Sequence, residues 1–352
     1  MFELEQRAYP AAHRLLNDLS STHAAIAAVL DGTIDGQVWV DRISDPRVAL
    51  VANGDAYFLA GSPDQAARSF PELKRLMPEW AYVFIEDRWQ DYLGEIWSNP
   101  FALPHPRIRL GLLGGPGGGM AVVLPDGFTL APIDQALLDL GPGNLDTVAD
   151  LMERWRSSGL FLEKAIGFCV LHDGCIVSHC ATDSVSGDRC ELGVGTEPTY
   201  RRLGLGKAAA AATVAECVRR GVNRIEWHTH ASNRGSIAIA RACGLEELDR
   251  HMAYSGNLPA ENVGDLDVSS CRAWAQHLER ASDQIGWYRF HAAGAWTLAG
   301  EHERALENLR LLVDRGWEGE AEWLESYWAI QALVRDPQFE AIVERQRAAS
   351  GG

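Results

Sequence analysis

The sequence lacks an excess of positive charge. Its 352 residues include 32 Lys and Arg against 48 Asp and Glu, which gives a formal net charge of −16. A nucleic-acid-binding protein normally presents a basic face that neutralises phosphates, so this balance argues against DNA or RNA as a partner. The composition, 47% hydrophobic and 23% charged, is that of a soluble globular protein. The length predicts two or three domains.

Cysteine pairs and long apolar runs are also missing. The seven cysteines are odd in number and form no CxxC pair, which argues against a disulfide framework and fits a reducing compartment. No apolar run is long enough to span a bilayer. The first residues, MFELEQRAYPAAHRLLND, mix acids and bases among the apolar positions, unlike a signal peptide. We therefore expect a cytoplasmic protein without a membrane partner.

Neither GxGxxG nor GxxxxGK[ST] occurs, so the common dinucleotide and P-loop motifs are excluded. The glycine-rich stretch Gly114–Gly119 precedes MAVVL, which is strand-like, rather than a helix whose N-terminus could hold an anion. We interpret it as the tip of a hairpin. The stretch YRRLGLGKAAAAA, at residues 200–212, is a different case.

Hydrophobic periodicity predicts three regions. Residues 1–150 combine helical stretches with strands such as QVWVDR and a hairpin, RVALVANGDAYFLAG, that turns at Asn53-Gly54-Asp55. Between Phe161 and Tyr254 the order is three strands, the glycine motif, helix, strand, helix, strand. From residue 261 the pattern is helical throughout. The expected fold class is therefore α/β (α+β): an N-terminal α/β domain (1–150), a mixed sheet flanked by helices (151–260) and an all-helical domain (261–352).

The glycine motif lies between a predicted strand and a predicted helix. The first N–H groups of a helix have no partners within the helix, and its dipole places partial positive charge there. Gly204 and Gly206 lack the Cβ atoms that would keep an anion away. Arg201, Arg202 and Lys207 add full positive charges, and the alanines let the helix lie close to a sheet. This arrangement predicts a pyrophosphate-binding site.

The stretch ELGVGTEPTYRRLGLGKAAAA resembles the acetyl-CoA signature of the GNAT superfamily of N-acetyltransferases, with Thr196, Pro198, Arg201, Gly204 and Gly206 at the signature positions. ASNRGSIAIARACGLEE resembles the second signature of that superfamily. The resemblance covers roughly residues 160–255. A longer stretch, from about residue 35 to 255, resembles the subgroup of this superfamily related to zwittermicin-resistance acetyltransferases.

The resemblance implies an enzyme that uses acetyl-CoA as cosubstrate and acetylates a primary amine, on a small molecule or a peptide, by direct attack in a ternary complex. The implied cofactor-binding residues are Val194, Gly195 and Thr196 for the pantetheine and acetyl groups, Arg201, Arg202, Leu203, Gly204, Leu205, Gly206 and Lys207 for the pyrophosphate, and Asn233 and Ser236 in the second signature. Asn233 and Ser236 are also residue types that cap helices, and the two roles are compatible.

An ammonium substrate needs a general base. Glu191, at the start of the cofactor strand, resembles the acidic residue of many relatives, and His228 and His230 share one face of the strand EWHTH. No third ligand is evident near these two histidines, so no metal is expected. Ala240 stands where many relatives carry a tyrosine acid. That change leaves an alternative open: an acyl-CoA-binding sensor or adaptor with weakened catalysis.

The C-terminal region resembles a tetratricopeptide unit, two helices punctuated by Gly300 and ended at Gly316. One such unit cannot bury its own apolar face. Residues 261–352 are therefore expected to pack on the rest of the chain, to pair with a second subunit, or to bind a protein partner. Four tryptophans are expected in the core or in an interface: Trp296, Trp317, Trp323 and Trp328.

Overall fold

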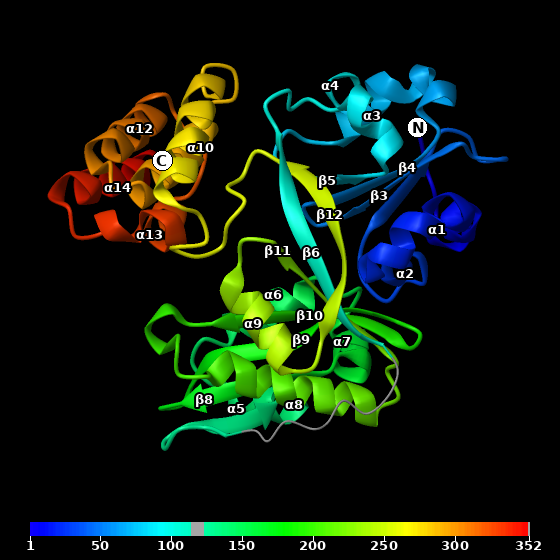
Figure 1. The fold of residues 1–352 in the computed structure, drawn as a ribbon, viewed down its shortest axis with the longest axis horizontal. Coiled ribbons are helices and arrows are strands. Elements are labelled where there is room, and N and C mark those ends of the chain that lie inside the picture. The colour runs from blue at the N-terminus through cyan, green and yellow to red at the C-terminus, as the bar shows by residue number, and fades with distance from the viewer. Residues whose placement is uncertain (114–122, 351–352) are drawn as a thin grey trace. The chain divides into compact units, whose positions relative to one another are not determined.

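The computed structural model describes residues 1–113 and 123–350 (Figure 1). The glycine-rich stretch interpreted as a hairpin tip lies outside the described residues. The chain forms two compact units. The first consists of Met1–Pro100, Pro106–Ala231 and Gly235–Ala253, and the second of Phe101–His105, Ser232–Arg234 and Tyr254–Gly352. Within the described ranges, none of the helices has both the length and the apolar character that crossing a membrane requires.

The first half of the sheet-containing part begins at β1 and ends at β6. Its elements are β1 (Phe2–Glu3), α1 (His13–Thr22), α2 (Ala24–Leu30), β2 (Gln37–Val40), β3 (Val48–Asn53), β4 (Ala56–Gly61), α3 (Phe70–Leu76), β5 (Tyr82–Ile85), α4 (Leu93–Ile96) and β6 (Leu103–Leu113). The predicted hairpin is confirmed: β3 and β4 pair antiparallel, and Gly54 at the turn has φ +58°, a conformation that glycine adopts without strain.

The second half runs from β7 to β12. Its elements are β7 (Thr129–Pro132), α5 (Gln135–Leu140), α6 (Asp146–Glu153), α7 (Ser158–Lys164), β8 (Gly167–His172), β9 (Cys175–Ser186), β10 (Arg189–Thr196), α8 (Leu205–Arg219), β11 (Arg224–His230), α9 (Arg234–Ala242) and β12 (Glu246–Ser255). From β8 onward this is the predicted order of strands and helices.

The two halves repeat one topology. The strands form a single sheet in the order β1-β2-β3-β4-β5-β12-β6-β11-β10-β9-β8-β7. In each half the first four strands pair antiparallel in succession, and the fifth pairs parallel with the fourth. The sixth strands are exchanged: β12 of the second half lies beside β5, and β6 of the first half lies beside β11 (Figure 1).

The expected fold class is confirmed, since the structure is a mixed sheet flanked by helices followed by a helical region. The finer division of the first 260 residues at position 150 stays a prediction. One sheet runs through both parts, and both contribute to the first compact unit.

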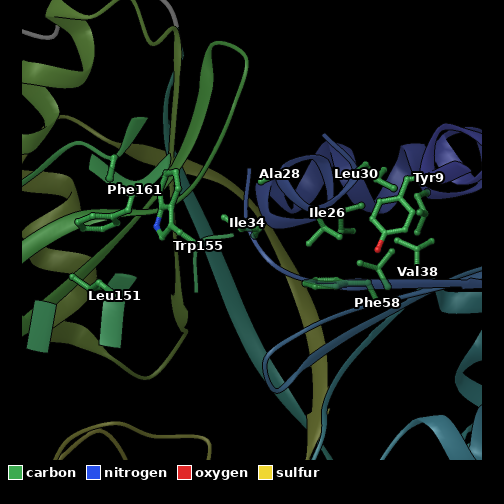
Figure 2. Close-up of a cluster of buried hydrophobic side chains, with 14 of the residues drawn as sticks. Tyr9, Ile26, Ala28, Leu30, Ile34, Val38, Phe58, Leu151, Trp155 and Phe161 are labelled. Atoms are coloured by element: carbon green, nitrogen blue, oxygen red, sulfur yellow. The ribbon is translucent and has the colours of Figure 1, made fainter. Parts of the chain in front are cut away.

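Two apolar cores fill the first unit. One joins the two halves: Ile34 forms a bridge with Trp155, and the buried residues around them include Ile26, Phe58 and Phe161 (Figure 2). The other lies between α8 and the faces of β8, β9 and β10 that it covers. Ala209 and Ala210 are completely buried there, so the alanine run lets this helix approach the sheet closely, as predicted.

The second unit is helical. It contains α10 (Val268–Ala281), α11 (Tyr288–Leu298), α12 (His302–Asp314), α13 (Ala321–Ser326) and α14 (Pro337–Ser350). Trp296 is fully buried in its core, as predicted, whereas Trp323 is 56% exposed, so for Trp323 only the interface prediction remains. A Cβ on Gly294 would lie 2.7 Å from the Tyr327 ring. Glycine is required there because the two segments approach so closely.

Candidate active site

The glycine motif forms the N-terminal end of α8. Gly204 precedes the helix with φ +82°, and no side chain caps the helix. Arg201, Arg202 and Lys207 around this end are exposed. Because the first N–H groups of α8 have no side-chain acceptor, the helix end presents free donors and cationic side chains to an anion.

The strand before the motif diverges from its neighbour. β10 pairs with β11 only from Arg189 to Glu191. Beyond that point β10 pairs with β9 alone, and Glu197 N donates to Val177 O (2.9 Å) in the same register. Since backbone groups alternate in direction along an antiparallel pair, the N–H groups of Val194 and Thr196 point away from β9, into the gap where β10 and β11 separate.

Gly193 and Gly195 on β10 make room for two polar side chains of β9. A Cβ on Gly193 would lie 2.5 Å from Oδ2 of Asp183, and one on Gly195 would lie 2.4 Å from Cε1 of His179. Asp183 stands at an irregularity in the pairing, since Glu191 faces Ser184 and Leu192 faces Thr182. Bulges of this kind re-aim side chains near active sites.

Asp183 is half-buried on the same face of the sheet as Glu191. Burial raises the pKa of Asp183 to about 6, and the charge of Glu191 adds to that shift, while Arg154 opposes it. Nη1 of Arg154 lies 3.8 Å from Oδ1 of Asp183. Sequence reasoning missed Asp183 and His179; the glycines opposite them were the available signal.

The two histidines predicted as candidate bases, His228 and His230, share one face of β11. The His228 side chain is 4% exposed, and His230 is buried near the ring of Tyr82. His228 belongs to a group with His23 and His251. Burial is the main cause that lowers the pKa of His23 well below its usual value and the pKa of His251 to about 4. The imidazoles of His23 and His251 are therefore neutral at physiological pH.

The carboxylate beside this group, Glu226, is fully buried. It accepts from Arg189 (Nη2 to Oε2, 2.6 Å), and its Oε1 lies 3.4 Å from Nη1 of Arg109. Burial acts to raise the pKa of Glu226, but the nearby His228 ring, the hydrogen bond from Arg189 and the charges of Arg189 and Arg109 outweigh it and hold the pKa below its usual value. Glu226 is therefore ionised.

The second predicted signature divides between the two units. Asn233 belongs to the second unit, where its amide donates to Oε2 of Glu261 (2.5 Å). Ser236 lies in α9, and its hydroxyl accepts from Nε1 of the buried Trp227 (2.8 Å). The cofactor contacts expected of both residues stay predictions, and the bond from Trp227 gives Ser236 a structural role.

Replacing Ser236 by alanine separates these two roles. Loss of the acceptor leaves a buried indole N–H unsatisfied, which costs about 1–3 kcal/mol. We expect lower thermal stability with an unchanged KM for acetyl-CoA. A KM that rises while stability stays constant would instead assign Ser236 to the cofactor.

Two further side chains bear on the chemistry. Ala240, at the position of the tyrosine acid of many relatives, is completely buried in the core beside α8. The Cys243 thiol is half-buried, and burial raises its pKa to about 11 despite the nearby charge of Lys207. A thiol with that pKa is protonated at neutral pH and is a poor nucleophile.

Known proteins are similar to this chain in sequence. A family model described as GNAT acetyltransferase matches residues 13–254. An uncharacterised N-acetyltransferase of Bacillus subtilis is 26% identical over 261 residues, which cover 72% of this chain and 97% of the relative. The ribosomal protein bS18 alanine N-acetyltransferase of Escherichia coli is 27% identical over 92 residues, 26% of this chain and 62% of the relative.

The fold is also found among solved structures. A GCN5-related N-acetyltransferase-like protein from Streptococcus suis superposes with a TM-score of 0.55 at 24% identity, over 71% of this chain and 98% of that one. The family match includes both halves of the sheet and covers well over half of the residues. The chain therefore belongs to the GNAT acetyltransferase family of enzymes.

Proposed function

We propose that the protein transfers the acetyl group of acetyl-CoA to a primary amine by direct attack in a ternary complex. The observation that carries the proposal is the uncapped, glycine-flanked N-terminus of α8 beside the divergence of β10 and β11. The test is an activity assay with acetyl-CoA and a panel of primary amines on small molecules and peptides. Acetyl transfer is measured by the release of the free thiol of coenzyme A. Binding without turnover would support the acyl-CoA sensor, which family membership does not favour.

The cofactor would lie along the gap between β10 and β11. Its pyrophosphate would accept from the first N–H groups of α8, with Arg202 and Lys207 supplying charge. Its pantetheine would pair with the free backbone groups of β10. The Val194 N–H is placed to donate to the thioester carbonyl and to stabilise the oxyanion that develops during attack.

We assign the general base to Asp183, with Glu191 beside it. A base works best when its pKa lies near the operating pH, and Asp183 meets that condition. The face that carries both carboxylates also suits a cationic amine, since the two charges attract it. His228 and His230 are the alternatives, and their burial disfavours them because a base must reach the substrate proton.

The pH profile distinguishes the two carboxylates. With Asp183 as base, kcat/KM rises with pH to a plateau, because the carboxylate must lose its proton first. The Asp183→Asn variant is expected to lose this rise, the acid limb of the profile, and to react about 10²–10⁴-fold more slowly. Glu191→Gln is expected to keep the limb and move it to lower pH, since removal of the neighbouring negative charge lowers the pKa of Asp183.

Arg154→Gln is the matched control. Loss of the cation near Asp183 raises the pKa of that carboxyl, so the limb should move to higher pH. If Glu191→Gln abolishes the limb while Asp183→Asn retains it, the base is Glu191. Wild-type profiles in both variants would return attention to His228 and His230.

We also propose a subgroup of the family, a cellular compartment and a role for the C-terminal region. We place the protein with the zwittermicin-resistance type of the family and in the cytoplasm, where its seven free cysteines stay reduced. The hairpin of α11 and α12 around Gly300 supports a tetratricopeptide-like unit. Residues 261–352 would then serve in dimerisation or in binding a protein partner.

A further inference from the structure

Three histidines meet inside the first unit. His23 lies at the junction of α1 and α2, His228 on β11 and His251 on β12. One ring nitrogen of each lies within 4.8 Å of the corresponding nitrogens of the other two. The ring centroids are 4.9 Å apart for His23 and His251, 5.2 Å for His23 and His228, and 5.4 Å for His228 and His251.

Two of the nitrogens lack hydrogen bonds. Nε2 of His228 and Nε2 of His251 are buried with no hydrogen-bond partner among the residues that the structure describes. Buried polar atoms are nearly always paired, and leaving one unpaired costs free energy. A ligand that accepts electron pairs from both nitrogens would remove that cost.

A carboxylate stands behind one of the rings, and a second carboxylate lies near the cluster. Oδ1 of Asp249 lies 3.4 Å from Nδ1 of His251, which leaves Nε2 of that ring available. Oε2 of Glu226 lies 3.8 Å from the unpaired Nε2 of His228, which is too far for a hydrogen bond but places a negative charge beside that nitrogen. Metal-binding histidines commonly direct their second nitrogen to a carboxylate, which orients the ring and makes it a better donor.

Arginines pair with both nearby carboxylates. Arg109 binds Asp249 (Nε to Oδ2, 2.8 Å) and approaches Glu226, and Arg189 binds Glu226. Arg107 lies over the ring of Tyr82. Two phenylalanine rings pack against His23: the ring of Phe84 lies 4.6 Å and that of Phe58 5.0 Å from the His23 ring, centroid to centroid.

We propose that His23, His228 and His251 bind one divalent transition-metal ion, with zinc as the best match. Three imidazoles with no thiolate suit zinc and its first-row neighbours, and leave a fourth position open for water. Bonds of about 2.0–2.1 Å to a tetrahedral ion bring ligand nitrogens roughly 3.4 Å apart. The rings therefore close by about an ångström on binding.

The ligands come from both halves of the sheet: His23 from the first, His228 and His251 from the second. An ion held by all three would join the helical part of the first half to the exchanged strand of the second. This structural role of the metal ion is independent of acetyl transfer, so metal binding can be measured without an activity assay.

Cobalt(II) is the probe for this site. The full-length chain without an affinity tag is treated with a chelator, dialysed and titrated with Co²⁺, and visible absorption is followed. We expect one equivalent to bind with the intense bands of a four-coordinate ion, and Zn²⁺ to displace it. His251→Gln and His228→Gln are expected to weaken binding at least tenfold. His13→Gln, at an exposed position of α1, is the matched control and should bind like the wild type.

Circular dichroism without metal checks that each variant is folded. If His251→Gln or His228→Gln does not fold, His23→Phe replaces it, because an aromatic ring fits beside Phe58 and Phe84 without a coordinating nitrogen. The proposal is overturned if the wild type binds no cobalt with four-coordinate absorption. It is equally overturned if folded ligand variants bind as tightly as His13→Gln.

Discussion

Replacing Gly206 by glutamate is expected to abolish coenzyme A binding. Gly206 lies in the first turn of α8, where the proposed pyrophosphate would accept from backbone N–H groups. A carboxylate there would occupy the position of the anion and repel it. We expect the dissociation constant for acetyl-CoA, measured by calorimetry, to rise more than a hundredfold.

The substitution also has a structural cost, so it needs controls. A Cβ on Gly206 would lie 3.0 Å from Oγ1 of Thr196 and 3.3 Å from Cδ1 of Ile239, and these neighbours must shift slightly. Lys207→Glu, at an exposed position, avoids this cost and should weaken binding at least tenfold. Gly94→Glu, in open space, and Lys74→Glu, at an exposed position of α3, are the matched controls. Unchanged affinity in folded Gly206→Glu would refute the pyrophosphate assignment.

A chain that ends at Asn257 is expected to aggregate or to lose much of its thermal stability. Residues 258–352, which this shorter chain lacks, contact two segments from earlier in the sequence, Phe101–His105 and Ser232–Arg234. The ring of His277 is 2.7 Å from the carbonyl of Phe101, and Trp274 packs edge-on against His105. The hydroxyl of Ser232 donates to the carbonyl of Pro259.

The size of this effect follows from what becomes exposed. Uncovering the half-buried Phe101 ring costs about 1 kcal/mol, and each of the two lost hydrogen bonds costs about 1 kcal/mol. A loss of about 3 kcal/mol lowers the Tm by roughly 6–12 °C in a chain of this size. A control chain that ends at Arg347 lacks only residues 348–352, and its Tm should equal that of the full chain. A soluble, monomeric and equally stable shorter protein would make the C-terminal region an independent module.

Local signals in the sequence predicted local structure well. The Asn53-Gly54-Asp55 turn, the strand before Gly204 and the helix after it each depend on residues close together in the chain. The uncapped, glycine-flanked N-terminus of α8 could therefore be predicted from the sequence alone. Trp323 shows what hydrophobicity alone leaves open, because it predicts a core or an interface position and the residue is exposed on α13.

Features that depend on distant pairing could not be predicted. Asp183 reaches the face of Glu191 because of an irregularity in the pairing of β9 with β10, which no single-strand pattern encodes. The contact of His23 with His228 and His251 requires the two halves to be assembled. Exchange of the sixth strands is likewise invisible in hydrophobic periodicity, since an inserted strand and an edge strand can have the same residue pattern.

The strand exchange has a consequence for how the chain folds during synthesis. β5 ends at Ile85, yet β12, its neighbour in the sheet, begins only at Glu246, about 160 residues later. At about 5–20 residues per second a ribosome needs roughly 10–30 s to make that interval. Throughout this time the exposed edge of β5 is an unpaired template for other strands. The nascent protein therefore depends on protection of that edge until its own last strand emerges.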